Sequence, residues 1–95
     1  MRKENSTVSL GGDFMFHKVK EVNTLSDYIL QITFQDGTKK FYDVSKLFLK
    51  WDIFKNLKTI KGLFNQVKVD KGGYGISWND EIDLSCDELW ENGYI

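Results

Sequence analysis

The chain has 95 residues, of which 41% are hydrophobic and 15% aromatic, and its formal net charge is −1 at neutral pH. This length fits one domain with one core. No apolar run approaches the ~20 residues that span a membrane, and Met1 to Asp13 lacks a signal-peptide pattern. A single cysteine, Cys86, excludes an intrachain disulfide and favours a cytoplasmic location.

The charges are distributed unevenly along the chain. Residues 1–71 carry 13 basic and 8 acidic side chains, a net charge of +5. Residues 72–95 carry 6 acidic and no basic side chains, a net charge of −6. Either the two sets of charges meet in space and partly cancel, or an acidic C-terminal face binds a basic partner.

The N-terminal part is expected to contain one strand. Residues 1–13 show weak periodicity and are predicted to be a flexible leader before a single domain over residues 14–95. Phe14 to Val22 predicts the first strand, with a bulge or strand end near Glu21. Asn23 to Asp27 has the composition of a turn.

Tyr28 to Asp43 predicts a β-hairpin around Asp36-Gly37, because its side chains alternate between two faces. Asp-Gly favours a two-residue type I′ turn, which pairs Ile32 with Phe41. The predicted core face holds Leu30, Ile32, Phe34 and Phe41. The other face, predicted to be more hydrated, holds Thr33, Gln35, Thr38 and Lys40. A shift of one residue would exchange these assignments.

Two short helices are predicted next. Asp43 has the side chain of an N-cap before a helix over Val44 to Lys50. Asp52 to Lys58 is predicted to be irregular, and Thr59 precedes a second helix over Ile60 to Gln66. The apolar stripe of the first helix is Val44, Leu47, Phe48 and Trp51. Residues expected to face inward after it are Ile53, Phe54, Leu57, Leu63 and Phe64.

The C-terminal part predicts a second hairpin and a last helix. Val67 to Asp70 and Gly75 to Trp78 flank a glycine-rich turn, and Ile82 to Leu84 alternates again. Ser85 to Glu88 has the pattern of a capping box, and Asn92-Gly93 ends the helix. The whole pattern predicts an α+β fold. We expect a small, mostly antiparallel sheet of about five strands, two hairpins plus an N-terminal strand, with two or three short helices packed on it.

The residues that usually carry catalysis or bind metals are scarce. His17 is the only histidine and is interpreted as a strand residue, and Cys86 falls on the apolar stripe of the last helix. One histidine and one cysteine do not make the usual zinc set. The acids Asp80, Glu81, Asp83, Asp87 and Glu88 lack the EF-hand spacing. Gly72 to Gly75 lacks both phosphate-binding fingerprints. We therefore expect no catalytic residue, no cofactor and no metal, and the chain is predicted not to be an enzyme.

A nucleic-acid-binding accessory domain is an alternative, because several lysines could line one side near Trp51. A sequence pI of about 5.7 argues against it, and a solvated face explains the lysines equally well. These lysines are Lys39, Lys40, Lys46, Lys50, Lys55, Lys58 and Lys61.

Three stretches of the chain resemble a known family. They are Met15 to Val22, Tyr28 to Phe48 and Phe64 to Gly93, the last with a Gly-Tyr-Gly-Ile-Ser-Trp strand and an Ile-Asp-Leu-Ser turn. In these residues the chain resembles the small prokaryotic domain-of-unknown-function 2442 family. The resemblance implies a compact α+β fold and brings no activity, cofactor or catalytic residue. It also implies two associations: some members precede a helix-turn-helix domain, and others are encoded beside a second small protein, as in toxin–antitoxin pairs.

The first functional hypothesis is a small, non-catalytic interaction or regulatory module. A small protein encoded nearby is the expected kind of partner, and a homo-oligomer remains open. An antitoxin-like component of a toxin–antitoxin pair is a second hypothesis. The candidate partner-binding surface is Tyr74, Trp78, Asp80, Glu81 and Asp83. The alternative that Tyr74 and Trp78 only cover the core stays open.

Overall fold

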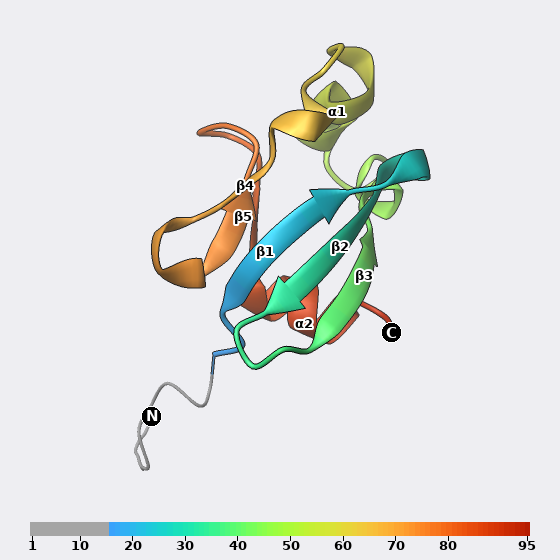
Figure 1. Ribbon diagram of the computed structural model, residues 1–95. Coiled ribbons are helices and arrows are strands. Elements are labelled where there is room, and N and C mark those ends of the chain that lie inside the picture. The colour runs from blue at the N-terminus through green and yellow to red at the C-terminus, as the bar shows by residue number, and fades with distance from the viewer. Residues whose placement is uncertain (1–15) are drawn as a thin grey trace.

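The computed structural model describes residues 16–95, which form two small antiparallel sheets and two α-helices (Figure 1). The first sheet has β1 (Val19–Thr24), β2 (Ile29–Phe34) and β3 (Lys39–Asp43), and the second has β4 (Lys68–Val69), β5 (Gly75–Ser77) and β6 (Asp83–Ser85). The α-helices are α1 (Asn56–Thr59) and α2 (Cys86–Asn92). The 3-10 turns are η2 (Ser26–Tyr28), η3 (Val44–Leu47), η4 (Asp52–Lys55), η5 (Phe64–Gln66) and η6 (Lys71–Gly73).

The α+β class is confirmed, whereas the prediction of one sheet of about five strands is wrong. The chain leaves β3 through a long run of helical turns, so β4 to β6 form a sheet of their own instead of extending the first. Helix α2 packs against β3 of one sheet and against β5 and β6 of the other, so it joins the two. The predicted leader over residues 1–13 lies outside the described residues.

The first strand carries the predicted bulge. Val19 pairs with Phe34 and Glu21 pairs with Thr33, so Lys20 is the extra residue on β1. The strand runs on to Thr24, later than expected, so the turn predicted over residues 23–27 begins only after it. Residues 14 and 15, the predicted start of the strand, lie outside the described part.

The β2–β3 hairpin is present, but its predicted register is wrong by one residue. Ile32 pairs with Lys40 instead of Phe41, and the loop contains three residues, Gln35 to Gly37. The Gly37 amide donates to the Phe34 carbonyl at 2.9 Å, and only Gly37 in this loop has a left-handed φ, of +94°. This is a type I turn followed by a glycine bulge, which Asp-Gly accommodates as well as the type I′ turn.

The register decides which side chains of β3 face the core. Tyr42 is buried opposite Leu30, whereas Phe41, the predicted core residue, is half-buried and lies against Tyr94. Lys40 shares the core-side face, and its ammonium donates to the Trp90 carbonyl in the last turns of α2. Helix α2 has no basic residue in its last turn, so Lys40 supplies the cation that its C-terminal dipole favours.

The β1–β2 connection is backbone-strained. Asp27 and Tyr28 have φ values of 61° and 62°. In the described part of the chain they are the only non-glycine residues with a positive φ. An aromatic residue rarely adopts this conformation. The Tyr28 ring packs edge-on against Phe48 and Phe64, with centroid distances of 5.3 and 5.1 Å, and these contacts offset the strain.

The segment between the sheets is built from tight turns and not from the two predicted helices. The Asp43 cap is confirmed, since its carboxylate accepts from the Ser45 amide at 3.0 Å, but η3 is a 3-10 turn. The α-helical residues are Asn56–Thr59, in the part predicted to be irregular. The predicted helix over residues 60–66 is wrong, because Gly62 turns the chain with a φ of +83°.

The last helix begins at the predicted Ser85 N-cap, but of the capping box the structure records only the Ser85 half, because the Glu88 carboxylate accepts from Tyr42 and Asn92. The Ser85 hydroxyl accepts from the Glu88 amide at 3.1 Å. The Glu88 carboxylate accepts from the Tyr42 hydroxyl at 2.7 Å, which ties the helix to β3. The core is continuous through both sheets and α2. Its fully buried residues include Val19, Leu30, Ile32, Phe34, Val44, Ile76, Ile82 and Leu89.

Candidate functional site

The five residues of the sequence-predicted surface do not come together. Tyr74 precedes β5 and Trp78 follows it, so they lie at opposite ends of that strand. The Tyr74 ring contacts Phe16 at 5.6 Å between centroids and lies under the Lys18 ammonium at 4.9 Å. Tyr74 is exposed, but it lies at the other end of β5 from the turn that carries Asp80 and Glu81.

Trp78 belongs to the core. Its side chain is 4% exposed, and its indole N–H donates to the Phe64 carbonyl at 3.0 Å. It also packs near the rings of Phe54 and Phe64. We therefore remove Trp78 from the candidate surface, in agreement with the interpretation that it covers the core.

The acids after Trp78 are exposed. Asp80 and Glu81 lie in a turn held by Asn79, whose side-chain oxygen accepts from two backbone amides at 2.9 Å, and Asp83 begins β6. Asp80 and Asp83 line a hollow of about 390 Å³ together with Asp70, Ser77 and Lys68. Within residues 16–95, no group of three His, Cys, Asp or Glu side chains is placed to hold a metal ion. The acids can attract basic groups of a partner.

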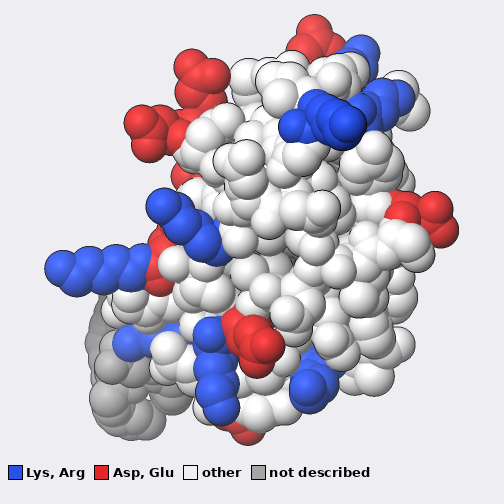
Figure 2. Space-filling view, turned by 45° about the horizontal axis from the view of Figure 1, so that its top comes forward, with Lys and Arg blue, Asp and Glu red and all other residues white. Residues whose placement is uncertain are grey.

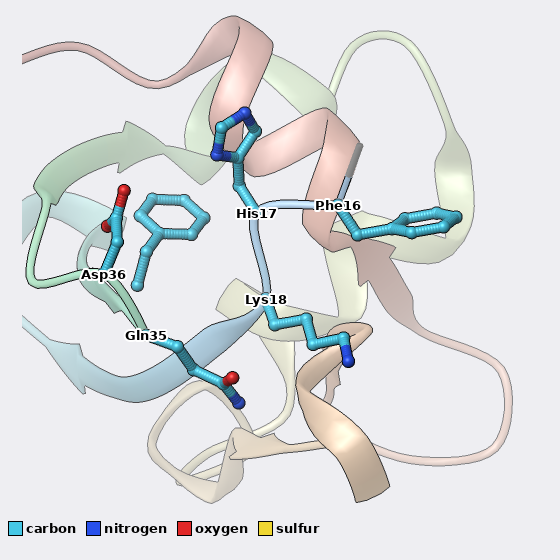
Figure 3. A pocket seen from close by; sticks show the side chains of 6 residues that line it. Phe16, His17, Lys18, Gln35 and Asp36 are labelled. Atoms are coloured by element: carbon cyan, nitrogen blue, oxygen red, sulfur yellow. The ribbon is translucent and has the colours of Figure 1, made fainter. Parts of the chain in front are cut away.

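His17 lies before β1 and not inside the strand. Its ring stacks on Trp90 at 3.5 Å between centroids, and it lines a hollow of about 290 Å³ with Asp36 (Figure 3). Hydrogen bonds from Thr38, and secondarily the charge of His17, hold the pKa of Asp36 below its ordinary value. Phe16 and Lys18 point away from Asp36 in this view, so the hollow brings His17 beside one carboxylate.

Two further polar groups, the Cys86 thiol and the Tyr42 hydroxyl, take part in the packing and hydrogen bonding of the fold. Cys86 is buried as predicted, and burial raises the pKa of its thiol, with the Asp87 carboxylate adding to the effect. Burial, followed by the Glu88 carboxylate, raises the pKa of Tyr42 above its ordinary value. Neither group is prepared for nucleophilic chemistry, because each is held in its neutral form.

A further candidate surface is one end of the molecule, at the top of Figure 1, whose exposed apolar side chains sequence reasoning missed. We call it the loop end: residues 25–28, 48–66 and 78–82, the last of which holds Asp80 and Glu81 of the sequence-predicted surface. Four large apolar side chains are exposed there: Leu25, Leu49, Trp51 and Ile60, with exposed fractions of 42, 94, 45 and 51%. The helical spacing of residues 44–51 placed Trp51 in the predicted apolar stripe. Leu49 lies off that stripe, so the sequence could have indicated that this apolar side chain faces solvent.

Aromatic contacts connect the three parts of the loop end. The Tyr28 ring touches those of Phe48 and Phe64, and Phe64 in turn lies against Trp78 at 6.3 Å between centroids. Phe54 also meets Trp78, at 6.2 Å. These packed aromatic rings therefore form the base of the loop end, beneath its exposed apolar side chains.

A hollow of about 410 Å³ opens between η2 and α1, and we call it the α1 hollow. Leu57 and Phe64 are its buried floor, while Leu25 and Ile60 form exposed walls. Lys58 and Lys61 also line it from the α1 side, and Asp27 lines it from η2.

The loop end carries charges of both signs, with its lysines in one segment. Residues 48–66 carry four lysines and one acid, Asp52, which pairs with Lys55 at 3.4 Å, whereas Asp27, Asp80 and Glu81 lie in the other two segments. Among residues 16–95, the pair of Asp52 and Lys55 is the only salt bridge. Lys58 and Lys61 therefore pair with no carboxylate of these residues. Figure 2, which tips this end forward, shows basic and acidic side chains around a broad uncharged area.

No helix among residues 16–95 is long and apolar enough to cross a membrane. The model of the family described as "Protein of unknown function (DUF2442)" matches residues 19–94. No curated protein and no solved structure matches the chain. The resemblance is thus confirmed over residues 19–93, and because the match covers most of the chain, the protein belongs to this family of unknown function.

Proposed function

We propose that the protein is a small, non-catalytic interaction module that binds a protein partner through the loop end. The observation that carries the proposal is the gathering of exposed Leu25, Leu49, Trp51 and Ile60 there. Leu25 and Ile60 share the α1 hollow, and exposed apolar side chains flanked by charge are typical of an interaction site.

The energetics support a binding role for these side chains. Complete burial of a Leu side chain is worth about 1.5–3 kcal/mol, and Leu49 gains almost none of it in the isolated chain, where it is 94% exposed. The packed aromatic base holds the loop end in place, so binding would cost little ordering entropy. Aromatic side chains such as Trp51 are enriched in the centres of interfaces.

Asp80 and Glu81 belong to the loop end and Asp83 follows it, so these three acids form the acidic side of the proposed surface. Basic groups of a partner would meet these acids, which steers association more than it adds affinity. The buried Cys86, whose thiol pKa is raised by burial, supports a non-catalytic role.

An antitoxin-like role is a special case of this proposal, in which the partner is a toxic small protein encoded nearby. Co-expression with such a neighbour should then restore growth. Lys58 and Lys61, which make no ion pair with residues 16–95, favour nucleic acid as a second candidate. In that case affinity would fall steeply with salt concentration.

The test compares two matched variants, Leu49→Ser and Ile95→Ser. Both side chains are almost fully exposed, at 94 and 92%, so neither substitution should affect folding. A stoichiometric partner captured from the source cells by the wild-type chain should be lost with Leu49→Ser and kept with Ile95→Ser. Equal capture by both variants, or capture of nothing by the wild-type chain, would refute the proposal.

A further inference from the structure

We infer that the α1 hollow receives a bulky apolar side chain of a partner protein segment whose neighbouring residues are acidic. This inference rests on the proposed function and adds the chemistry of the partner. It depends on three observations: an apolar floor with exposed walls, lysines on one side of the rim, and a carboxylate on the other.

The first observation sets the kind of group that fits. Leu57 and Phe64 close the floor, and Leu25 and Ile60 stand half in solvent on either side. A small-molecule site normally buries most of its ligand, which these open walls do not allow. A side chain attached to a partner's backbone is covered from above by the partner itself. The hollow therefore suits an anchor residue of a protein.

The second observation sets the charge of the segment around the anchor. Lys58 follows the floor residue Leu57 within α1, and its ammonium lies 5.5 Å from the centre of the Phe48 ring. Lys61 follows the wall residue Ile60 and makes no ion pair with any of residues 16–95. Both ammonium groups can therefore donate to carboxylates of a partner without breaking an ion pair within residues 16–95.

The third observation, the carboxylate of Asp27, indicates how the partner segment is oriented in the hollow. Asp27 lines the hollow from η2, opposite the lysines of the α1 side. Its carboxylate repels acids on that side, so the acids of the partner must lie towards α1. The strained backbone at Asp27 and Tyr28 fixes this wall, because the Tyr28 ring is held by Phe48 and Phe64.

Nucleic acid fits these residues less well. The walls are the aliphatic side chains of Leu25 and Ile60, whereas single-stranded nucleic acid stacks on exposed aromatic rings. Asp27 would also repel a phosphate backbone. An acidic, apolar peptide satisfies the walls and the lysines together.

The test is a selection from a random-peptide display library on the immobilised full chain. Enriched peptides should be acidic and contain at least one large apolar residue. A synthetic peptide of the enriched sequence should bind the wild-type chain and lose about tenfold in affinity with Ile60→Ser or Lys61→Glu. Asp27→Asn should have the opposite effect and tighten binding, because it removes the repelling charge and Asn tolerates the left-handed conformation.

Lys39→Glu on β3 is the matched control, since it changes the net charge by the same amount outside the hollow. Enrichment of basic peptides, absence of enrichment, displacement of the peptide by a single-stranded oligonucleotide, or equal effects of Lys39→Glu and Lys61→Glu would overturn the inference. A natural complex that depends on Leu49 but tolerates Ile60→Ser and Lys61→Glu would leave the proposed function standing and contradict this inference alone.

Discussion

Replacement of Tyr28 separates the strain of its backbone from the packing of its ring. At most positions glycine is less stable than alanine, because glycine loses more backbone entropy on folding. Tyr28 has a φ of 62°, where an L-residue with a Cβ pays about 1–2 kcal/mol. We therefore expect Tyr28→Gly to be more stable than Tyr28→Ala, the reverse of the usual order.

The expected difference is small but measurable. Both variants lose the ring contacts with Phe48 and Phe64, which we put at about 2 kcal/mol for a half-buried aromatic side chain. Glycine recovers the strain of about 1–2 kcal/mol and loses about 0.4–1 kcal/mol to chain entropy. The glycine variant should thus be the more stable by about 0.5–1 kcal/mol.

Urea unfolding followed by tryptophan fluorescence gives both free energies of unfolding, provided the denaturant slope is unchanged. Gln31 on β2 has an ordinary φ and is the control, where alanine should be more stable than glycine. If Tyr28→Ala equals or exceeds Tyr28→Gly in stability, the backbone at this turn is not strained and the reasoning fails.

Three further predictions concern contacts that hold the fold. Gly75→Ala should cost more than about 2 kcal/mol, because a Cβ there would lie 2.5 Å from the Leu84 carbonyl oxygen; a normal melting temperature would contradict this. Lys40→Gln should cost about 1 kcal/mol in urea unfolding, through the lost charged contact with the Trp90 carbonyl, and an unchanged midpoint would argue against it. The raised pKa of Tyr42 means that the unfolded chain releases this proton first, so stability should fall above pH 10, by up to about 1.4 kcal/mol per pH unit. Tyr42→Phe should show a flatter fall; equal slopes would show that Tyr42 does not contribute.

Local chemistry predicted much of the fold. The caps at Asp43 and Ser85, the bulge after Val19 and the burial of Leu30, Ile32 and Phe34 depend on residues close in sequence. Such features follow from one side chain and its neighbours. For this reason they could be predicted without the rest of the chain.

The register of β3 could not be predicted in this way. Asp36-Gly37 suits both a two-residue and a three-residue loop, and local residues do not choose between them. The chosen register buries Tyr42 and brings Lys40 to the end of α2, more than 40 residues away along the chain. Contacts distant in sequence therefore select the loop.

The candidate surface was only partly predictable for the same reason. The exposure of Asp80, Glu81 and Asp83 follows from their charge, but the burial of Trp78 depends on Phe64. The stripe that placed Trp51 in the core assumed a helix that continues to this residue, whereas η3 ends at Leu47 and Trp51 has an extended backbone, with φ −136° and ψ 120°. This break in the helical conformation leaves Trp51 partly exposed to solvent.

Site-specific photo-crosslinking tests the central claim most directly. A photoreactive phenylalanine analogue would be placed at position 49 in one sample and at position 95 in another, since both native side chains are exposed to the same degree. Irradiation in the source cells should give one defined crosslinked protein from position 49 and none from position 95. The same products from both positions, or none from position 49, would contradict the assignment of the loop end as the binding surface.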